Sequence, residues 1–251
     1  MKRINKIYIY DGSFEGLLTV VYYSLKESKI PTNIVKKGKV KTSLFETYES
    51  IDTEYDKSSI IFKSIPFKIS DLSLYNVYNA FLSNKNDKEL SILYYLINGF
   101  KYGYKIDSLR NLNCVCIVQK YAKMVKREMH RLKGFVRFKT VNGVLYSELE
   151  PDNDILELLV PHFKKRLSNE KWIIKDNKRN KAAFYNMNEV RIVNTNNIDL
   201  SKIRPDNEEK KYQFLWKSFI KSVNIKERKN LKCQRNFMPK KYWKYMSETE
   251  N

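Results

Sequence analysis

Hydrophobic positions in the first part of the chain predict a strand followed by a helix. Residues 5–10 alternate between apolar and polar side chains, which is typical of a strand with one buried face. After Asp11-Gly12-Ser13, apolar residues recur at the three- and four-residue spacing of an amphipathic helix. This stripe consists of Leu17, Leu18, Val21, Tyr22 and Leu25. The pattern predicts a β-α unit.

The pattern weakens between residues 29 and 65. Residues 29–41 are basic and residues 46–56 are acidic, which favours loops and an edge element. Residues 58–65 are the candidate for a short strand in this stretch.

Helical periodicity dominates residues 70–130. One apolar stripe follows a Ser70-Asp71 cap, and a second follows Asp87. The two stripes consist of Leu74, Val77, Tyr78, Phe81 and Leu82, and of Leu93, Leu96, Ile97 and Phe100. A longer apolar face over about residues 106–130 predicts a third helix, whose exposed side gathers lysine and arginine.

The dipeptide Asn142-Gly143 separates two alternating runs, residues 134–141 and 144–149, and predicts a hairpin with a two-residue turn. In that register Thr140 lies opposite Leu145, and Arg137 lies opposite Glu148. One face of the hairpin is therefore apolar and the other is charged.

Further elements follow the hairpin. A helix is expected at about 154–168, where Pro161 should kink or restart it. The remaining predicted elements are strands near 171–176, 182–186 and 189–193, and an amphipathic helix from Tyr212 to Val223 that precedes a cationic, aromatic tail. We expect an α+β fold, with helices packed on a small mixed or antiparallel sheet that includes the hairpin at about 134–150. Residues 1–251 are interpreted as one domain, with a possible subdivision into 1–118 and 119–251.

Charge makes the picture more specific. The chain has 48 Lys and Arg against 28 Asp and Glu, a net charge of +20. Residues 119–251 carry 31 basic and 16 acidic residues, whereas residues 1–118 carry 17 and 12. Compositional drift towards lysine should enrich glutamate as well, so a purely solvated surface is the weaker explanation. Cations interleaved with aromatics indicate binding to a polyanion, and DNA is the expected partner.

Hydropathy and cysteine content indicate a cytoplasmic protein. No apolar run reaches the length of a membrane span, and the N-terminal residues are charged where a signal peptide would be apolar. Cys114, Cys116 and Cys233 are expected to be reduced thiols. No membrane association, metal or cofactor is expected.

Residues suited to acid–base chemistry are few, and common catalytic motifs are absent. The candidates are His130, Glu128, Asp176 and Asp11, and Glu15 would join the carboxylates in a magnesium site if the fold gathered them. The alternatives are structural. Asp11 would cap the first helix, and Asp176 would form an ion pair with Arg179.

Residues suited to nucleic-acid binding are more numerous, because cations lie beside aromatic side chains that could stack on bases. The candidates are Arg131, Lys133, Phe135, Arg137, His162, Arg166, Trp172, Arg179, Arg235, Lys241 and Trp243. Two alternatives remain open. Arg137 would pair with Glu148 across the hairpin, or the aromatic side chains of the tail would pack onto the core.

Five segments carry a resemblance to a bacterial family of putative DNA-metabolism (DNA repair) proteins. They are Tyr10–Gly16, Glu128–Phe138, Pro161–Arg166, Trp172–Arg179 and Arg235–Trp243. The resemblance implies a DNA-associated role beside a putative radical-SAM repair protein similar to photoproduct lyases, and relatives are fused to uracil-DNA-glycosylase-like domains. This chain lacks the three-cysteine cluster motif of a radical-SAM enzyme, so it would be the partner of that enzyme.

These observations lead to one expectation and two alternatives. We expect a DNA-binding accessory protein in repair or modification. The first alternative is a nucleic-acid-processing hydrolase or lyase that uses His130, Glu128 or Asp176. The second is a basic module that binds RNA or an acidic protein.

Overall fold

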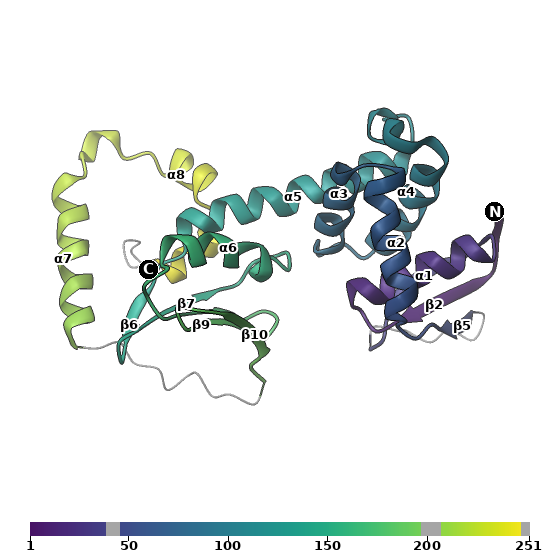
Figure 1. Ribbon diagram of the computed structural model, residues 1–251. Helices are drawn as coiled ribbons and strands as arrows, with labels where there is room; N and C mark the ends of the chain where they lie inside the picture. Colours follow the sequence, from purple (N-terminus) through teal and green to yellow (C-terminus); the bar gives the residue numbers. More distant parts are fainter. Residues whose placement is uncertain (39–45, 197–206, 247–251) are drawn as a thin grey trace. The chain divides into compact units, whose positions relative to one another are not determined.

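The computed structural model of the protein describes residues 1–38, 46–196 and 207–246 and has the expected α+β fold (Figure 1). Its contacts divide it into two compact units, Met1–Lys126 (unit 1) and Arg127–Asn251 (unit 2). The boundary falls within helix α5 (Asn113–Phe135). The prediction of a single domain with a possible subdivision after residue 118 stays a prediction. Among the described helices, none is both long and apolar enough to cross a lipid bilayer.

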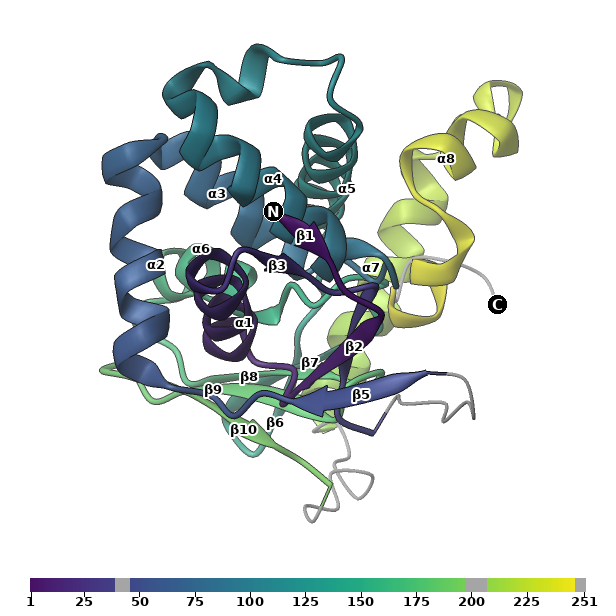
Figure 2. The ribbon, with the colours of Figure 1, turned by 90° about the vertical axis from the view of Figure 1, so that its right-hand side faces the viewer.

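Unit 1 is built on a three-stranded parallel sheet. Strand β2 (Lys6–Tyr10) lies between β4 (Asn33–Lys36) and β5 (Thr47–Ser50), and Figure 2 shows β2 beside β5. Helix α1 (Phe14–Lys26) connects β2 to β4, as parallel neighbours require. The predicted β-α unit is confirmed, and the weakly patterned stretch supplies both edge strands. A short pair, β1 (Lys2–Arg3) and β3 (Lys29–Ile30), lies outside this sheet.

The predicted strand at 58–65 is wrong, because these residues belong to helix α2 (Tyr55–Lys68). Ser58, Ile61 and Ile65 are the buried residues of this helix, at the spacing of one helical face. That face packs on α1. Adjacent β-branched residues gave a strand-like local signal, and burial against α1 overrides it.

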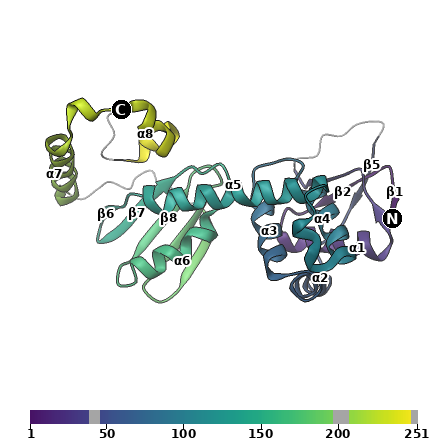
Figure 3. The same ribbon diagram turned by 90° about the horizontal axis from the view of Figure 1, so that it is seen from above.

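The next helices follow the predicted stripes. Helix α3 (Asp71–Phe81) begins after Ser70, whose hydroxyl accepts a hydrogen bond from the Ser73 amide, and α4 (Lys88–Tyr102) begins after Asp87. The third predicted helix differs at both ends. Residues 103–108 form the 3₁₀ turn η1 (Gly103–Ser108), and α5 begins only at Asn113 and runs unbroken to Phe135 (Figure 3).

Unit 2 contains a mixed five-stranded sheet in the order β10–β9–β8–β7–β6. Its strands are β6 (Lys139–Val141), β7 (Val144–Leu149), β8 (Trp172–Asp176), β9 (Lys181–Tyr185) and β10 (Val190–Asn194). Only the β7–β8 pair is parallel. The predicted hairpin is confirmed: Thr140 pairs with Leu145, and Asn142 and Gly143 have φ values of 48° and 73°. Strand β6 is shorter than expected because α5 continues to Phe135.

Helix α6 (Leu156–Arg166) makes the crossover between the parallel strands β7 and β8. It buries Leu156, Leu159 and Phe163 and packs on β9. The helix is continuous through Pro161, so the predicted restart is wrong, while the alternative of a kink at Pro161 stays a prediction. Pro161 lies on the exposed face, where the carbonyl that loses its amide partner can bind water instead.

The C-terminal part contains α7 (Asn207–Val223), η2 (Lys226–Arg228), α8 (Leu231–Phe237) and η3 (Lys240–Tyr245). Helix α7 confirms the predicted amphipathic helix. Tyr242 of η3 and the following Met246 are buried, so the last aromatic segment packs onto the core of unit 2.

Candidate nucleic-acid interface

Asp11 has the structural role that was its alternative. Its carboxylate accepts hydrogen bonds from the Ser13 amide (2.8 Å) and hydroxyl (2.7 Å), and the Ser13 hydroxyl in turn accepts from the Gly16 amide (2.9 Å). Burial alone would raise the pKa of Asp11, but the hydrogen bonds from Ser13 lower it. This arrangement caps α1 and confirms the capping interpretation.

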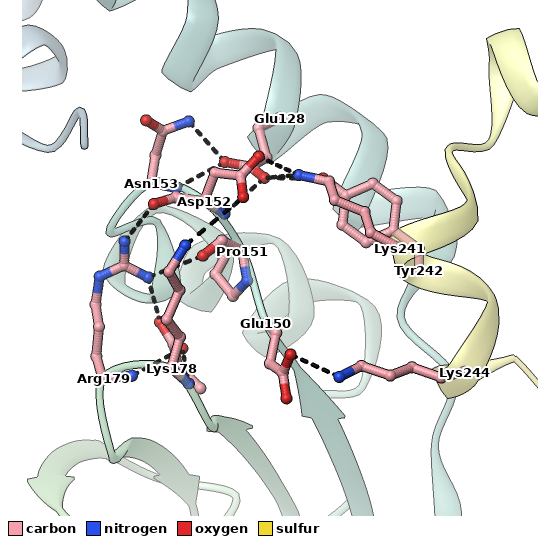
Figure 4. A network of polar contacts seen from close by, with 11 residues as sticks. Glu128, Glu150, Pro151, Asp152, Asn153, Lys178, Arg179, Lys241, Tyr242 and Lys244 are labelled. Atoms are coloured by element: carbon pink, nitrogen blue, oxygen red, sulfur yellow. Dashed lines mark hydrogen bonds and ion pairs between the residues drawn. The ribbon is translucent and has the colours of Figure 1, made fainter. Parts of the chain in front are cut away.

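Glu128 of α5 is buried and accepts hydrogen bonds from several directions (Figure 4). Its carboxylate accepts from the amides of Asp152 and Asn153 (both 2.9 Å), and from the side chains of Asn153 (2.6 Å), Tyr242 (2.8 Å) and Lys241 (3.0 Å). Burial alone would raise the pKa of Glu128, but these hydrogen bonds outweigh it and lower the pKa. Because both oxygens of the Glu128 carboxylate accept hydrogen bonds from the protein itself, Glu128 has a structural role.

Asp176 and Arg179 form the predicted ion pair, at 2.9 Å. Asp176 is completely buried, and burial raises its pKa although Arg179 acts in the opposite direction. The guanidinium of Arg179 also donates to the carbonyls of Pro151 (3.1 Å) and Asp152 (2.6 Å). The pairing interpretation of Asp176 is confirmed.

These groups belong to one set of contacts, the 150–154 network, which surrounds the loop after β7. Lys241 contacts Asp152 as well as Glu128, and Lys244 contacts Glu150 at 2.6 Å (Figure 4). The network connects that loop with α5, with the β8–β9 turn and with η3 at the C-terminal end of the described chain. Four predicted site residues, Glu128, Asp176, Arg179 and Lys241, therefore come together as structural residues. Asp152 and Asn153 in their midst were not predicted.

The aromatic candidates are less accessible than expected. Trp172 is completely buried, with its ring centroid 5.2 Å from that of Tyr185, so in this fold it offers no face for stacking on a base. Phe135 contacts Tyr242 at 5.8 Å between ring centroids. The Trp243 indole donates to the Met238 carbonyl at 2.9 Å. Trp172 belongs to the core because β8 is the central strand of the sheet.

Cations lie near the ends of two helices of unit 2, α5 and α6. Arg131 and Arg166 are exposed, and Lys133 and His162 are partly buried. Burial lowers the pKa of His162, and Lys133 and Arg166 lower it further. Two cations from different helices thus act on one imidazole. We call Arg131, Lys133, His162 and Arg166 the helix-end cluster; Lys164 and Lys165, which were not among the predicted site residues, are exposed in the same last turn of α6.

The other predicted residues have local partners or are exposed. The Arg137 guanidinium donates to the Gly134 carbonyl at 2.8 Å, close to the end of α5, and Glu148 accepts from the Tyr146 hydroxyl at 2.6 Å. Arg137 therefore precedes β6 and is not part of the hairpin ladder. His130 on α5 and Arg235 on α8 are exposed.

The described part of the chain contains no group of three or more His, Cys, Asp or Glu side chains placed to hold a metal ion. Glu128 and Asp176 both belong to the 150–154 network, whereas Asp11 caps a helix of unit 1. Arg131 and Arg166 carry exposed positive charge on unit 2, and such charge suits phosphate groups.

No curated protein matches the sequence. A family model does match, over residues 86–248, which include the helix-end cluster, the 150–154 network and α7. The chain belongs to the family of the domain of unknown function DUF4130.

Proposed function

We propose that the protein is a DNA-binding accessory protein in DNA repair or modification, and that the helix-end cluster contacts the phosphate backbone. The observation that carries this proposal is the run of three exposed cations in the last turn of α6, Lys164, Lys165 and Arg166, on the helix that also bears His162. Cations this close repel one another, and a bound phosphate would relieve that repulsion.

The arrangement of donors supports phosphate binding. Arg131 and Arg166 present guanidinium groups, which bind phosphate oxygens in a bidentate manner. The buried Nε2 of His162 has no hydrogen-bond partner within the described structure. The charge of a phosphate bound beside Lys133 and Arg166 would favour the protonated imidazole. Contacts of this kind give affinity without reading sequence.

An accessory role suits the positions of the carboxylates. Asp11 belongs to the cap of α1, and Glu128 and Asp176 belong to the 150–154 network, so all three carboxylates already have structural partners. The chemistry would then belong to a partner enzyme. The family resemblance in the sequence favours a photoproduct-lyase-like radical-SAM protein or a uracil-DNA-glycosylase-like protein as that partner.

Equilibrium binding to labelled DNA tests this proposal. The purified protein is titrated with single-stranded, duplex, and uracil- or photoproduct-bearing DNA at two salt concentrations, with a matched RNA as competitor. The test variant is Lys133→Glu/Arg166→Glu. The control is Lys101→Glu/Lys105→Glu, which makes the same charge change at exposed lysines of unit 1.

We expect the test variant to lose at least about tenfold in affinity and to reduce the slope of log K against log salt by about 2, because each lost phosphate contact accounts for roughly 0.9. The control should lose much less. Equal loss in both variants would show that only net charge matters, and unchanged affinity in the test variant would reject the cluster as the DNA site. Preferential competition by RNA would favour an RNA-binding module.

A further inference from the structure

The two faces of the five-stranded sheet of unit 2 differ in how they are covered. Trp172 pairs with Tyr185, and the ring of Tyr185 lies 6.0 Å from Nζ of Lys164 on α6, so both aromatic residues lie on the face that α6 covers (Figure 1). Ile173 follows Trp172 along β8 and therefore points to the opposite face, where it is partly exposed. We call this opposite face the open face.

One row of paired residues crosses all five strands on the open face. In order from β6 to β10 it consists of Lys139, Tyr146, Ile173, Phe184 and Arg191. The middle of the row is aromatic and apolar, and both ends are cationic. Tyr146 is buried, and its strand contacts η3, whereas Phe184 is partly exposed. Phe184 is therefore the aromatic residue of this row that presents surface to a ligand.

Lysines flank the accessible middle of this row. Lys139 is exposed at its β6 end, and Lys175 lies in the next row of the same face, on the strand beside that of Phe184. Arg191 at the β10 end pairs with Glu189 at 2.6 Å. The positive charge of the open face that remains for a ligand thus comes from Lys139 and Lys175.

The acid on the open face is held by its neighbours. Glu148 lies in the row of Lys175, and its carboxylate accepts hydrogen bonds from the Tyr146 hydroxyl (2.6 Å) and the Asn177 side chain (3.4 Å). These bonds hold the carboxylate at the end of the sheet where β7 and β8 finish. The part of the face around Phe184 is therefore left with positive charge.

An aromatic ring bordered by lysines suits a single-stranded nucleic acid. Such a strand offers bases that stack on the ring and phosphates that meet the cations. The bases of a duplex stack on one another, so a duplex offers no free base to Phe184. The core of a protein–protein interface, in contrast, is depleted of lysine.

We propose that the open face binds single-stranded DNA, with Phe184 stacked on a base and Lys139 and Lys175 in contact with phosphates. The choice of DNA rests on the proposed function, and this inference adds the form of DNA and a second surface. Neighbouring strands lie about 4.8 Å apart, so Lys139 and Phe184 are separated by about 14 Å along the row. The helix-end cluster includes Arg166 of α6, the helix on the other face, so the two surfaces can be altered separately.

Fluorescence anisotropy with labelled oligothymidine and with a labelled duplex of the same length tests the proposal. Phe184→Leu removes the ring and keeps an apolar side chain, and Phe184→Tyr retains the ring. The matched control is Phe67→Leu, which removes an aromatic side chain that is 88% exposed in unit 1. The lysine variant is Lys139→Ala/Lys175→Ala, and its control is Lys101→Ala/Lys105→Ala.

Phe184→Leu should lose at least about fivefold in affinity for the single strand, the effect of one lost stacking contact, and less than about twofold for the duplex. Phe184→Tyr and Phe67→Leu should remain within about twofold of the wild type. The lysine variant should reduce the slope of log K against log salt for the single strand by about 1.4, since each phosphate contact accounts for roughly 0.7. Its control should leave that slope unchanged.

Unchanged affinity of Phe184→Leu for the single strand would overturn the proposal, and so would an equal loss for the duplex or tighter binding to oligouridine. If circular dichroism shows that Phe184→Leu does not fold, the lysine variant decides, and an unchanged salt slope overturns the proposal. An unaffected Phe184→Leu beside a weakened Lys133→Glu/Arg166→Glu would reject the open face and leave the proposed function in place. Failure of the wild type to bind either DNA would reject both.

Discussion

At the scale of single residues, burial determines which of the candidate side chains are structural. Glu128, Asp176 and Trp172 have chemistry that suits a site, yet the fold buries all three. Arg131 and Arg166 are exposed cations on the same unit. Charge and aromaticity can be read from the sequence, whereas burial depends on the tertiary structure. The sequence therefore identifies the candidate side chains but does not separate the buried ones from the exposed ones.

The contacts of Glu128 predict a large effect on stability. Glu128→Ala leaves the Asp152 and Asn153 amides, Lys241 and Tyr242 without their acceptor, so we expect the free energy of unfolding of unit 2 to fall by about 3 kcal/mol. Urea denaturation measures this change. The control is the exposed Glu170→Ala, which should change stability by less than about 0.5 kcal/mol. Equal effects of both variants would contradict a structural role for Glu128.

The lowered pKa of Glu128 predicts an acid-sensitive contribution to stability. A carboxyl with a lowered folded-state pKa contributes stability above its ordinary value, 4.5 here, and loses that contribution as pH falls through the folded-state pKa. The free energy of unfolding should therefore fall below pH 4.5, by at most about 1.4 kcal/mol per pH unit for this one proton.

The variant Glu128→Gln isolates this contribution. Asp176 acts in the opposite direction, because its raised pKa favours the folded state at low pH, and it is present in both proteins. The difference in stability between wild type and Glu128→Gln should thus be constant above pH 5 and shrink in acid. A difference that stays constant down to pH 3 would show that Glu128 does not titrate in this range.

Sequence separation determines which polar contacts were predictable. Asp176 and Arg179 are three residues apart across a turn, so their ion pair could be anticipated. Glu128 and Lys241 are 113 residues apart, and no local pattern relates them. The 150–154 network was missed for this reason, although both of these residues had been singled out for other roles.

At the scale of helices and strands, periodicity and turn residues predicted most elements correctly. The register of the hairpin followed from Asn142-Gly143 alone, because positive φ values at both positions specify a two-residue turn. The strand predicted at residues 58–65 is wrong because the β-branched side chains of this segment favour a strand locally, whereas its helical stripe consists of only three buried positions. The end of α5 was predicted too early because Phe135 fits both the helical pattern of α5 and the alternating pattern of the hairpin.

Two glycines within helices predict opposite effects of one substitution. An added Cβ at Gly16 would lie 2.3 Å from Oδ1 of Asp11 and 2.8 Å from Oγ1 of Thr53, so Gly16→Ala should disrupt the cap of α1 and cost about 1–3 kcal/mol. At Gly134 no atom lies within 4 Å of the added Cβ. Gly134→Ala should therefore stabilise the protein by about 0.5–1 kcal/mol, because alanine favours the helix. Thermal unfolding compares the two; a stabilising Gly16→Ala would contradict the described cap.

At the scale of the whole molecule, the sequence showed where charge accumulates but not which surfaces remain exposed. The stripe of α7 has the same periodicity as that of α3, yet Val77 of α3 is completely buried and Phe219 of α7 is 54% exposed. An amphipathic stripe predicts only that one face of the helix packs against another apolar surface. Whether another part of the same chain supplies that partner depends on tertiary structure, which periodicity does not contain.

The division into two units makes the distribution of tryptophan informative. Trp172, Trp216 and Trp243 all lie in Arg127–Asn251, so tryptophan fluorescence reports on unit 2, whereas far-ultraviolet circular dichroism reports on the helices of both units. If the units unfold separately, Glu128→Ala should lower the urea midpoint seen by fluorescence and leave one component of the circular dichroism transition in place. Substituting Trp216 by Phe restricts the signal further towards the buried Trp172. Coincident transitions in both proteins would instead mean that the units unfold as one, with the continuous helix α5 transmitting the destabilisation across their boundary.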